Sequence, residues 1–310
     1  MNVKSHIHTV FFGTHDFAAT ILEGLLSSPL FSVDLVITRP DEPVGRSQEL
    51  QSPPVKLLVE SKGIKVEQPE NLKNYRIEEL KNYELGVTAQ YGGLIPKSIL
   101  DSFQRGMINV HTSLLPKYRG ASPIQHALMN GDTETGVTIM LMDMGLDTGP
   151  ILLQKKVSIE PDDTYEILDK KLSIVGLKAL LEAVPQYIAG DLKPTPQDES
   201  HATICKKLSR DDGHVDWNKS AEEIYNRYRG LHPWPGIWTM VDGKRLKLLN
   251  VKPTEKAIPT GTVVFEQDHL FIGCSTGSLE ILELQPEGKK VMDANAFKAG
   301  YKTLNGTTVS

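Results

Sequence analysis

Three polar side chains near the middle of the chain could together transfer an acyl group to an amine. Asn109 and His111 are two residues apart, so on a strand both side chains project from one face. Asp147 follows in the motif Asp147-Thr148-Gly149, where a glycine-containing loop could bring a carboxylate back to that strand. The amide could stabilise an oxyanion, the imidazole could carry a proton, and the carboxylate could orient the imidazole or accept a proton.

Each of these residues also has a purely structural explanation. Asn109 alone could be a turn residue, and His111 alone could be a hydrogen-bonded histidine of a core. Their shared strand face, together with the Asp-Thr-Gly motif further along the chain, favours a catalytic set. No cluster with metal-ligand spacing accompanies them, so we expect chemistry that needs no metal.

The elements that would position these side chains can be predicted from the spacing of apolar residues. Strands are predicted at 7–12, 33–38, 85–89, 107–110 and 136–142, and helices after a Thr14 cap, at 54–62, 123–129 and roughly 163–187. This alternation is typical of an α/β fold with a Rossmann-like parallel sheet. Ligands of such sheets bind at the carboxyl ends of the strands, which is where Asn109 and His111 lie.

The second half of the chain has a different pattern. Residues 189–197 are rich in glycine and proline and indicate a linker. A helix at 220–229 precedes short alternating segments at 238–241, 244–251, 261–265, 270–274 and 279–284. Short strands separated by turns are typical of a small β-barrel. We therefore expect a catalytic domain over 1–189, a linker over 190–208 and a β-barrel domain over 209–310.

Composition and charge restrict the class of protein. The chain has 310 residues and a net charge of −5, so the molecule as a whole is not an electrostatic binder of nucleic acid. The two cysteines, Cys205 and Cys274, are far apart and form no redox or metal motif. We identify no secretory signal and no stretch that approaches the length of a membrane span, so we expect a cytoplasmic protein without a membrane partner. Nothing implies an obligate protein partner.

Longer motifs surround the three polar residues. Residues 109–116, 118–120 and 147–149 together resemble the formyltransferases that use 10-formyltetrahydrofolate. Further segments are similar to the methionyl-tRNA formyltransferase branch, and they are residues 12–17, 52–56, 91–96, 216–217, 232–236 and 285–290. The resemblance implies formyl transfer to the α-amino group of methionyl initiator tRNA, for translation initiation. It also implies a Rossmann-like formyltransferase domain followed by an oligonucleotide-binding-like barrel that binds tRNA.

The resemblance also implies roles for individual residues. Asn109 and His111 would stabilise the oxyanion, and Asp147 would hold His111 and help to carry the proton of the amine. The small-molecule folate would be bound by residues of two loops, namely Tyr91, Gly92, Ser113, Leu114, Leu115 and Pro116. The tRNA would be bound by basic residues of both halves, namely Arg39, Arg46, Lys244, Arg245, Lys289 and Lys290.

One loop departs from the family pattern. The related enzymes have a more basic loop where this chain has Glu42, Gln48 and Glu49. In the family this loop reaches the acceptor end of the tRNA. Only Arg39 and Arg46 remain as cations here, so a solvated surface loop is an alternative for this segment.

Other functions remain open at this stage. The same three residues would also suit formyl transfer to an amino-sugar nucleotide or another small amine, or a hydrolase that releases formate. A non-catalytic RNA-binding module is an alternative of a different class. Trp234 and Trp238 could stack on bases, but we expect them to pack between the barrel and its helix because large aromatic side chains are usually buried.

Overall fold

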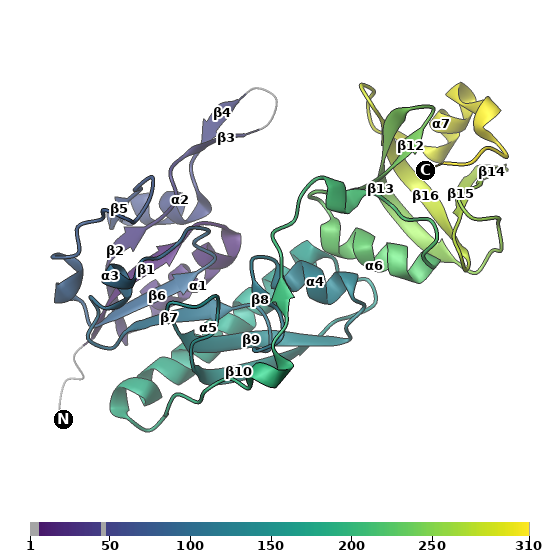
Figure 1. Ribbon diagram of the computed structural model, residues 1–310. Helices are drawn as coiled ribbons and strands as arrows, with labels where there is room; N and C mark the ends of the chain where they lie inside the picture. The colour runs from purple at the N-terminus through teal and green to yellow at the C-terminus, as the bar shows by residue number, and fades with distance from the viewer. Residues whose placement is uncertain (1–5, 45–47, 310) are drawn as a thin grey trace. The chain divides into compact units, whose positions relative to one another are not determined.

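The computed structural model describes residues 6–44 and 48–309, and their contacts divide the chain into two compact units (Figure 1). The first unit comprises Met1–Gly120, Glu134–Ser158 and Asp169–Cys205. The second comprises Ala121–Thr133, Ile159–Leu168 and Lys206–Ser310, so two short segments of the first half join the C-terminal residues.

The first unit is built on a mostly parallel sheet with the strand order β10-β9-β7-β6-β1-β2-β5 (Figure 1). The strands are β1 (Ile7–Gly13), β2 (Phe31–Ile37), β5 (Lys65–Glu67), β6 (Leu85–Ala89), β7 (Met107–His111), β9 (Glu134–Leu141) and β10 (Ile151–Ser158). The strands from β7 to β5 are parallel, whereas β9 is antiparallel to β7, and β10 is antiparallel to β9. The predicted α/β fold with a Rossmann-like sheet is confirmed, and β5 and β10 are additional strands of this sheet.

Helices α1 (Asp16–Ser27) and α5 (Tyr165–Ala189) pack closely within this unit. A Cβ added to Gly24 of α1 would lie 2.2 Å from Leu177 of α5, and one added to Gly176 would lie 2.9 Å from Val110 of β7. These glycines therefore permit close approach between the helices and the sheet. The shorter helices of this unit are α2 (Pro54–Glu60) and α3 (Lys97–Leu100).

Two sequence predictions for these helices need correction. In the described part of the chain no side chain caps α1, and the Thr14 hydroxyl donates instead to the Tyr91 carbonyl at 2.8 Å. Helix α5 is long and apolar enough to cross a membrane by length and composition, although no such stretch was identified in the sequence. Its residues Leu172, Leu180 and Val184 are fully buried, as expected for a core helix.

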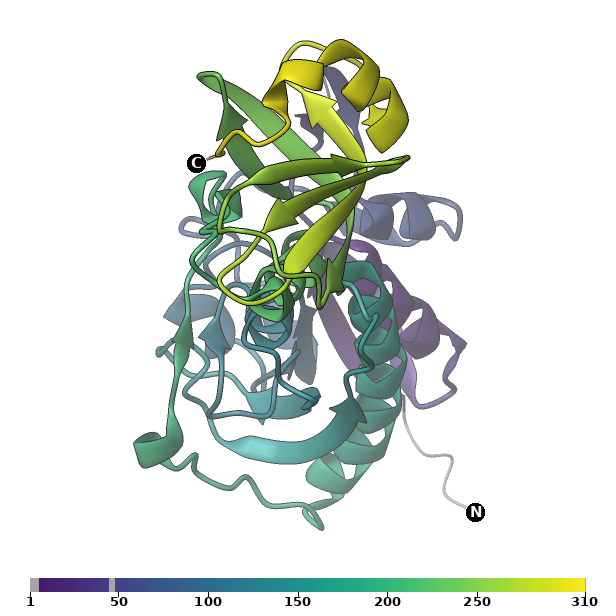
Figure 2. The ribbon, with the colours of Figure 1, turned by 90° about the vertical axis from the view of Figure 1, so that its right-hand side faces the viewer.

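The second unit contains an antiparallel sheet with the order β12-β13-β16-β15-β14 (Figure 2, green to yellow). Its strands are β12 (Ile237–Val241), β13 (Lys244–Thr254), β14 (Val263–Glu266), β15 (His269–Gly273) and β16 (Ser278–Pro286), and β17 (Met292–Asp293) pairs with β16. The C-terminal β domain, predicted as a small β-barrel, is confirmed and is built on an antiparallel sheet. The helices of this unit are α4 (Pro123–Met129), α6 (Ala221–Leu231) and α7 (Ala294–Gly300).

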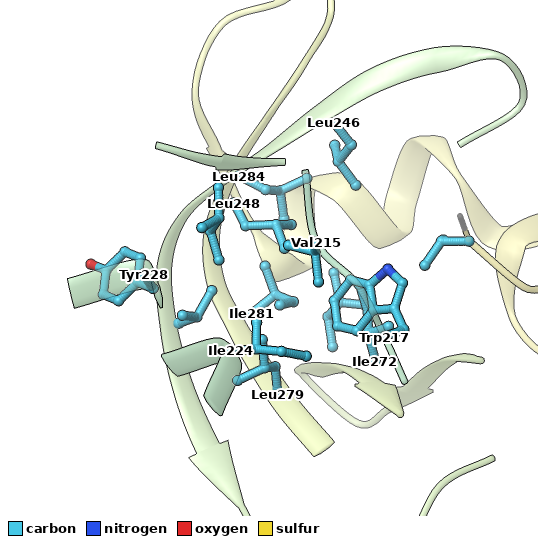
Figure 3. Packing of buried hydrophobic residues seen from close by; sticks show 14 of the residues in the cluster. Val215, Trp217, Ile224, Tyr228, Leu246, Leu248, Ile272, Leu279, Ile281 and Leu284 are labelled. Carbon is cyan, nitrogen blue, oxygen red and sulfur yellow. The ribbon is translucent and has the colours of Figure 1, made fainter. Parts of the chain in front are cut away.

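An apolar core lies between α6 and this sheet (Figure 3). Ile224 of α6 packs with Leu248, Leu279 and other sheet residues, and the buried Trp217 indole donates to the Thr239 hydroxyl at 3.0 Å. A capping box of Ser220 and Glu223 starts α6, as its sequence favours.

The prediction that Trp234 packs in the junction is wrong. Its side chain is 55% exposed. Trp238 is half-buried, and its indole donates to the Arg210 carbonyl at 3.0 Å.

Candidate active site

The carboxyl end of β7 presents the two polar residues that the sequence singled out. Asn109 pairs with Thr88 of β6 on one side and Met140 of β9 on the other, and His111 pairs with Thr138. The loop after β9 then brings Asp147 to the same place. The Asn109 amide donates to Asp147 Oδ1 at 3.4 Å, and His111 Nδ1 lies 3.6 Å from Asp147 Oδ2.

A backbone carbonyl fixes the orientation of His111. Its Nε2 lies 3.0 Å from the Tyr118 carbonyl, which can only accept, so Nε2 carries a proton. Nδ1 therefore faces Asp147, at a distance too long for a direct hydrogen bond. Only 6% of the His111 side chain and 15% of the Asp147 side chain are exposed, and burial strengthens attraction between the carboxylate and a protonated ring. Tyr118, rather than Asp147, thus orients the imidazole.

Asp147 is held in an unusual backbone conformation. Its φ is +52°, in the left-handed region, and its Oδ2 accepts a hydrogen bond of 2.8 Å from the Gly120 amide. The Gln197 amide donates to the carbonyls of Asp147 and Gly149, at 2.7 Å each. A Cβ at Gly149 would lie 1.8 Å from the Leu141 carbonyl oxygen, so only glycine allows this turn. The direction of the carboxylate is therefore set by the main chain around it.

The expected folate-binding residues contribute mainly backbone to this region. Ser113 and Leu115 are buried, and the Ser113 hydroxyl donates to the Lys117 carbonyl at 2.6 Å. The Leu115 amide donates to Thr138, and Leu114 and Pro116 are half-buried. Tyr91 is also buried, whereas Gly92 is exposed with φ +75°. The buried side chains shape the loops, and the backbone at Gly92 is exposed.

A cavity of about 730 Å³ lies against the loop that carries Asp147. It is lined by apolar side chains with charged groups among them, and these include Leu100, Phe103, Met107, Leu141, Met142, Met144, Lys97, Asp101, Arg105 and Asp143. Met107 alternates with Asn109 and His111 on β7, so it shares their face. The residues that line this cavity were not predicted from the sequence, although the alternation along β7 was a signal for Met107.

Four of the predicted tRNA-binding cations lie at one end of the C-terminal sheet. Lys244 and Arg245 begin β13, and the Glu287 amide donates to the Arg245 carbonyl at 2.9 Å. This bond places the turn that carries Lys289 and Lys290 beside them. The Arg245 guanidinium lies 3.9 Å from the centre of the Trp238 ring, and the His214 ring stacks on it at 4.4 Å. We call Lys244, Arg245, Lys289 and Lys290 the basic end.

The N-terminal loop contains the two other predicted cations. The Arg39 guanidinium donates to the Glu70 carbonyl at 3.0 Å, whereas Arg46 lies outside the described residues. Hydrogen bonds from Gln68 and Lys56 hold the pKa of the Asp41 carboxyl below its usual range. Glu42 begins β3 (Glu42–Val44), which pairs with β4 (Glu49–Gln51), and both glutamates are exposed.

Residues 6–44 and 48–309 contain no group of three or more His, Cys, Asp or Glu side chains that could hold a metal ion.

Comparison with known proteins shows which family this chain matches. The formyl transferase family matches residues 7–184, and the formyl transferase C-terminal domain matches residues 207–302. The methionyl-tRNA formyltransferase of Thermodesulfovibrio yellowstonii is 42% identical over 300 residues, which cover 96% of this chain and 97% of that protein. That of Caldicellulosiruptor saccharolyticus is 43% identical over 310 residues, covering 97% of this chain and 99% of its own.

A solved structure has a similar fold at low sequence identity. The N-formyltransferase from Helicobacter canadensis, in complex with folinic acid and dTDP-3-aminofucose, has a TM-score of 0.68 and 20% identity. The match covers 89% of this chain and 98% of that chain.

Proposed function

The chain belongs to the formyl transferase family, and from this premise we propose how its residues perform the reaction. The enzyme transfers a formyl group to the α-amino group of methionyl initiator tRNA. The formyl donor is derived from folate, and we assign it as 10-formyltetrahydrofolate. The observation that carries the proposal is the meeting of Asn109, His111 and Asp147 at the end of β7.

The substrate favours attack by an amine. Esterification of methionine to tRNA removes the neighbouring carboxylate charge and lowers the pKa of the amine, so more free amine is present near neutral pH. The amine nitrogen attacks the formyl carbon, and negative charge develops on the formyl oxygen. The second N–H of the Asn109 amide and Nδ1–H of a protonated His111 are the donors that stabilise this oxyanion.

Two proton transfers complete the reaction. Asp147 accepts the proton of the attacking amine, directly or through water. When the bond from the formyl carbon to the folate nitrogen breaks, that nitrogen takes the proton from His111 Nδ1. Transfer from Asp147 back to His111 restores the starting state, and Nε2 stays bonded to the Tyr118 carbonyl throughout. This scheme requires no metal ion.

We place the ring system of the folate in the cavity beside the Asp147 loop. The cavity is lined by apolar side chains with charged groups among them, and Met107 lies two residues before Asn109 on the same face of β7. Flat, partly polar rings suit such a site. Replacing Leu100 by Trp would fill the cavity and should raise the folate Kd with little change in kcat at saturation. An unchanged folate Kd would remove this cavity from the proposal.

We place the tRNA contact at the basic end of the second unit. The four cations of the basic end offer positive charge for phosphates. Changing Lys289 and Lys290 together to Glu should weaken tRNA binding more at low than at high salt, and leave folate binding unchanged. We also infer that the enzyme works in the cytoplasm, where translation begins.

The reaction itself is tested by offering four acceptors. The protein is incubated with 10-formyltetrahydrofolate and methionyl initiator tRNA, free methionine, an amino-sugar nucleotide or water alone. Formylation of the tRNA is the expected outcome. Preferred formylation of the nucleotide would support a sugar formyltransferase, and release of formate to water would support a hydrolase. Tight tRNA binding with no turnover would support the RNA-binding module.

A further inference from the structure

The segment expected to be a linker lies against the active site. Thr195 exchanges two hydrogen bonds of 2.8 Å with Ile151, just after the Asp147 loop. Thr203 donates to the Pro116 carbonyl at 3.2 Å and accepts from the Arg119 amide at 2.8 Å. The short strand β11 (Ile204–Cys205) then pairs in parallel with β8 (Arg119–Gly120). We call residues 195–205 the strap, because they join the loops on either side of the site.

Gln197 is the strap residue that contacts the Asp147 loop through its side chain. Its Nε2 donates to the carbonyl oxygens of Asp147 and Gly149, at 2.7 Å each. Its Oε1 accepts from Arg119 Nε at 3.0 Å and from Nη2 at 2.8 Å. Arginine can only donate and carbonyls can only accept, so these four bonds fix which end of the amide faces the loop.

Arg119 is itself buried and paired with a carboxylate. Its side chain is only 6% exposed, and Glu199 of the strap accepts two hydrogen bonds from it, at 2.7 and 2.8 Å. These bonds lower the pKa of the Glu199 carboxyl and raise that of the Arg119 guanidinium. The guanidinium that is paired with Glu199 therefore holds the amide oxygen of Gln197 in place.

We propose that Gln197 is a positioning residue for formyl transfer, which holds the loop so that the Asp147 carboxylate points at Asn109 and His111. The inference rests on the proposed catalytic role of Asp147. One of the two bonded carbonyls belongs to the left-handed Asp147, whose φ is +52°, and the other belongs to Gly149, two residues further on. The first bond restrains the peptide plane that directly follows Asp147, and the second restrains the end of its turn, so together they limit how the backbone that carries the carboxylate can rotate.

The chemistry of position 197 admits few side chains. Glutamate has the same length and would still accept from Arg119, but it would present oxygen atoms to two carbonyl oxygens. Asparagine is one methylene shorter and would not span the same distances. Methionine is similar in shape but forms none of these hydrogen bonds.

The decisive variant is Gln197→Glu in the full-length protein. It keeps the pairing with Arg119 and removes both donors to the Asp147 loop. We expect kcat for methionyl-tRNA to fall about 10- to 100-fold, because misplacing a catalytic group by about 1 Å has effects of this size. The Kd of folate and the Kd of tRNA should change less than twofold. Gln186→Glu is the matched control, since the exposed Gln186 amide donates to the Glu182 carbonyl at 3.0 Å, and it should leave kcat unchanged.

A double-mutant cycle separates positioning from a general structural role. If Gln197 acts through Asp147, Gln197→Glu should cost little further single-turnover rate once Asp147→Ala is present. A full additional loss in that background would overturn the inference, as would wild-type kcat in the single variant. If Gln197→Glu fails to fold, Gln197→Met is carried through the same cycle. Wild-type turnover of Asp147→Ala would instead refute the proposed catalytic role of Asp147, and absence of formylation by the wild-type protein would refute the proposed function, so these failures are distinguishable.

Discussion

The Gly120 amide donates a 2.8 Å hydrogen bond to the Asp147 carboxylate, across 27 residues of chain. Gly120 has φ +114°, and a Cβ at this position would lie 2.4 Å from the carbonyl oxygen of Cys205 in the strap. The same residue is therefore pressed between the strap on one side and the carboxylate on the other. Its lack of a side chain is what allows both contacts.

Replacing Gly120 by alanine should damage both stability and activity. The added Cβ would force the strap or the β8 backbone to move, at a cost of about 1–3 kcal/mol in the free energy of unfolding. We expect kcat to fall at least about tenfold as the donor to Asp147 shifts. Thermal unfolding and steady-state formylation measure the two effects. Gly300→Ala is the control, because within the described structure nothing lies within 4 Å of a Cβ there.

Replacing Asn109 by alanine should affect the rate of reaction rather than binding. Its amide lies at the end of β7, 3.4 Å from Asp147, where a donor can serve the oxyanion. Loss of such a donor costs about 10²–10³-fold in kcat. Single-turnover formylation and calorimetry with folate measure the rate and the binding. Near-wild-type turnover would show that Asn109 is not an oxyanion donor.

Replacing Asp169 by asparagine should stabilise the protein at neutral pH. Burial raises the pKa of this carboxyl to about 6, and the negative charge of Asp16 adds to the rise. The 3.0 Å hydrogen bond from Gln90 lowers the pKa and offsets part of this rise. In the unfolded chain this carboxyl titrates near pH 4. Its burial therefore does not lower the free energy of unfolding below about pH 4, and it lowers that free energy by the full amount above about pH 6.

The asparagine variant should therefore gain at most about 3 kcal/mol in the free energy of unfolding at pH 8. The gain should shrink as the pH falls from 6 towards 4. Urea unfolding at several pH values measures this dependence. A gain that is the same at every pH would mean that titration of Asp169 is not its cause.

The N-terminal loop gives a charge test of tRNA binding. If the loop approaches phosphate, Arg39→Ala should weaken tRNA binding and Glu42→Arg should tighten it. Both effects should shrink with added salt, since phosphate contacts act by counterion release and the Debye length is about 3 Å at 1 M. Kd values for methionyl initiator tRNA at two salt concentrations decide the matter. If both variants are silent, the loop is not part of tRNA recognition.

The sequence predicted the strands that carry regular signals. Residues 85–89 form β6 with the predicted bounds, because all five are buried and apolar or small enough for a central strand. β10 is the last strand of the sheet, next to β9, and it carries the half-exposed Lys155 and the exposed Lys156. As an edge strand it therefore lacks the continuous apolar signal. Thr14 was predicted to cap a helix, but its hydroxyl donates instead to the carbonyl of Tyr91, which is 77 residues away in the sequence. No local pattern contains that contact.

The site likewise contains residues that a local pattern predicts and residues whose contacts join distant parts of the chain. Asn109 and His111 could be paired from the sequence because a strand fixes which residues share a face. The roles of Tyr118 and Gln197 could not be predicted, since they depend on contacts of a carbonyl and an amide across loops. Trp234 was expected inside for its size, yet its side chain lies exposed on the surface in a proline-rich segment.

The strap has a consequence for how such proteins can be recombined. A junction between exchanged modules succeeds where few contacts cross it, and the glycine- and proline-rich stretch near Gly190 looks like such a place. In a chimera joined there, residues 197 and 203 would come from the other parent. The loops of the catalytic half, however, form hydrogen bonds with the native Gln197 and Thr203. A functional graft should retain the native chain through Cys205. In a lineage that exchanged its C-terminal halves, residues 195–205 should share the ancestry of the catalytic half.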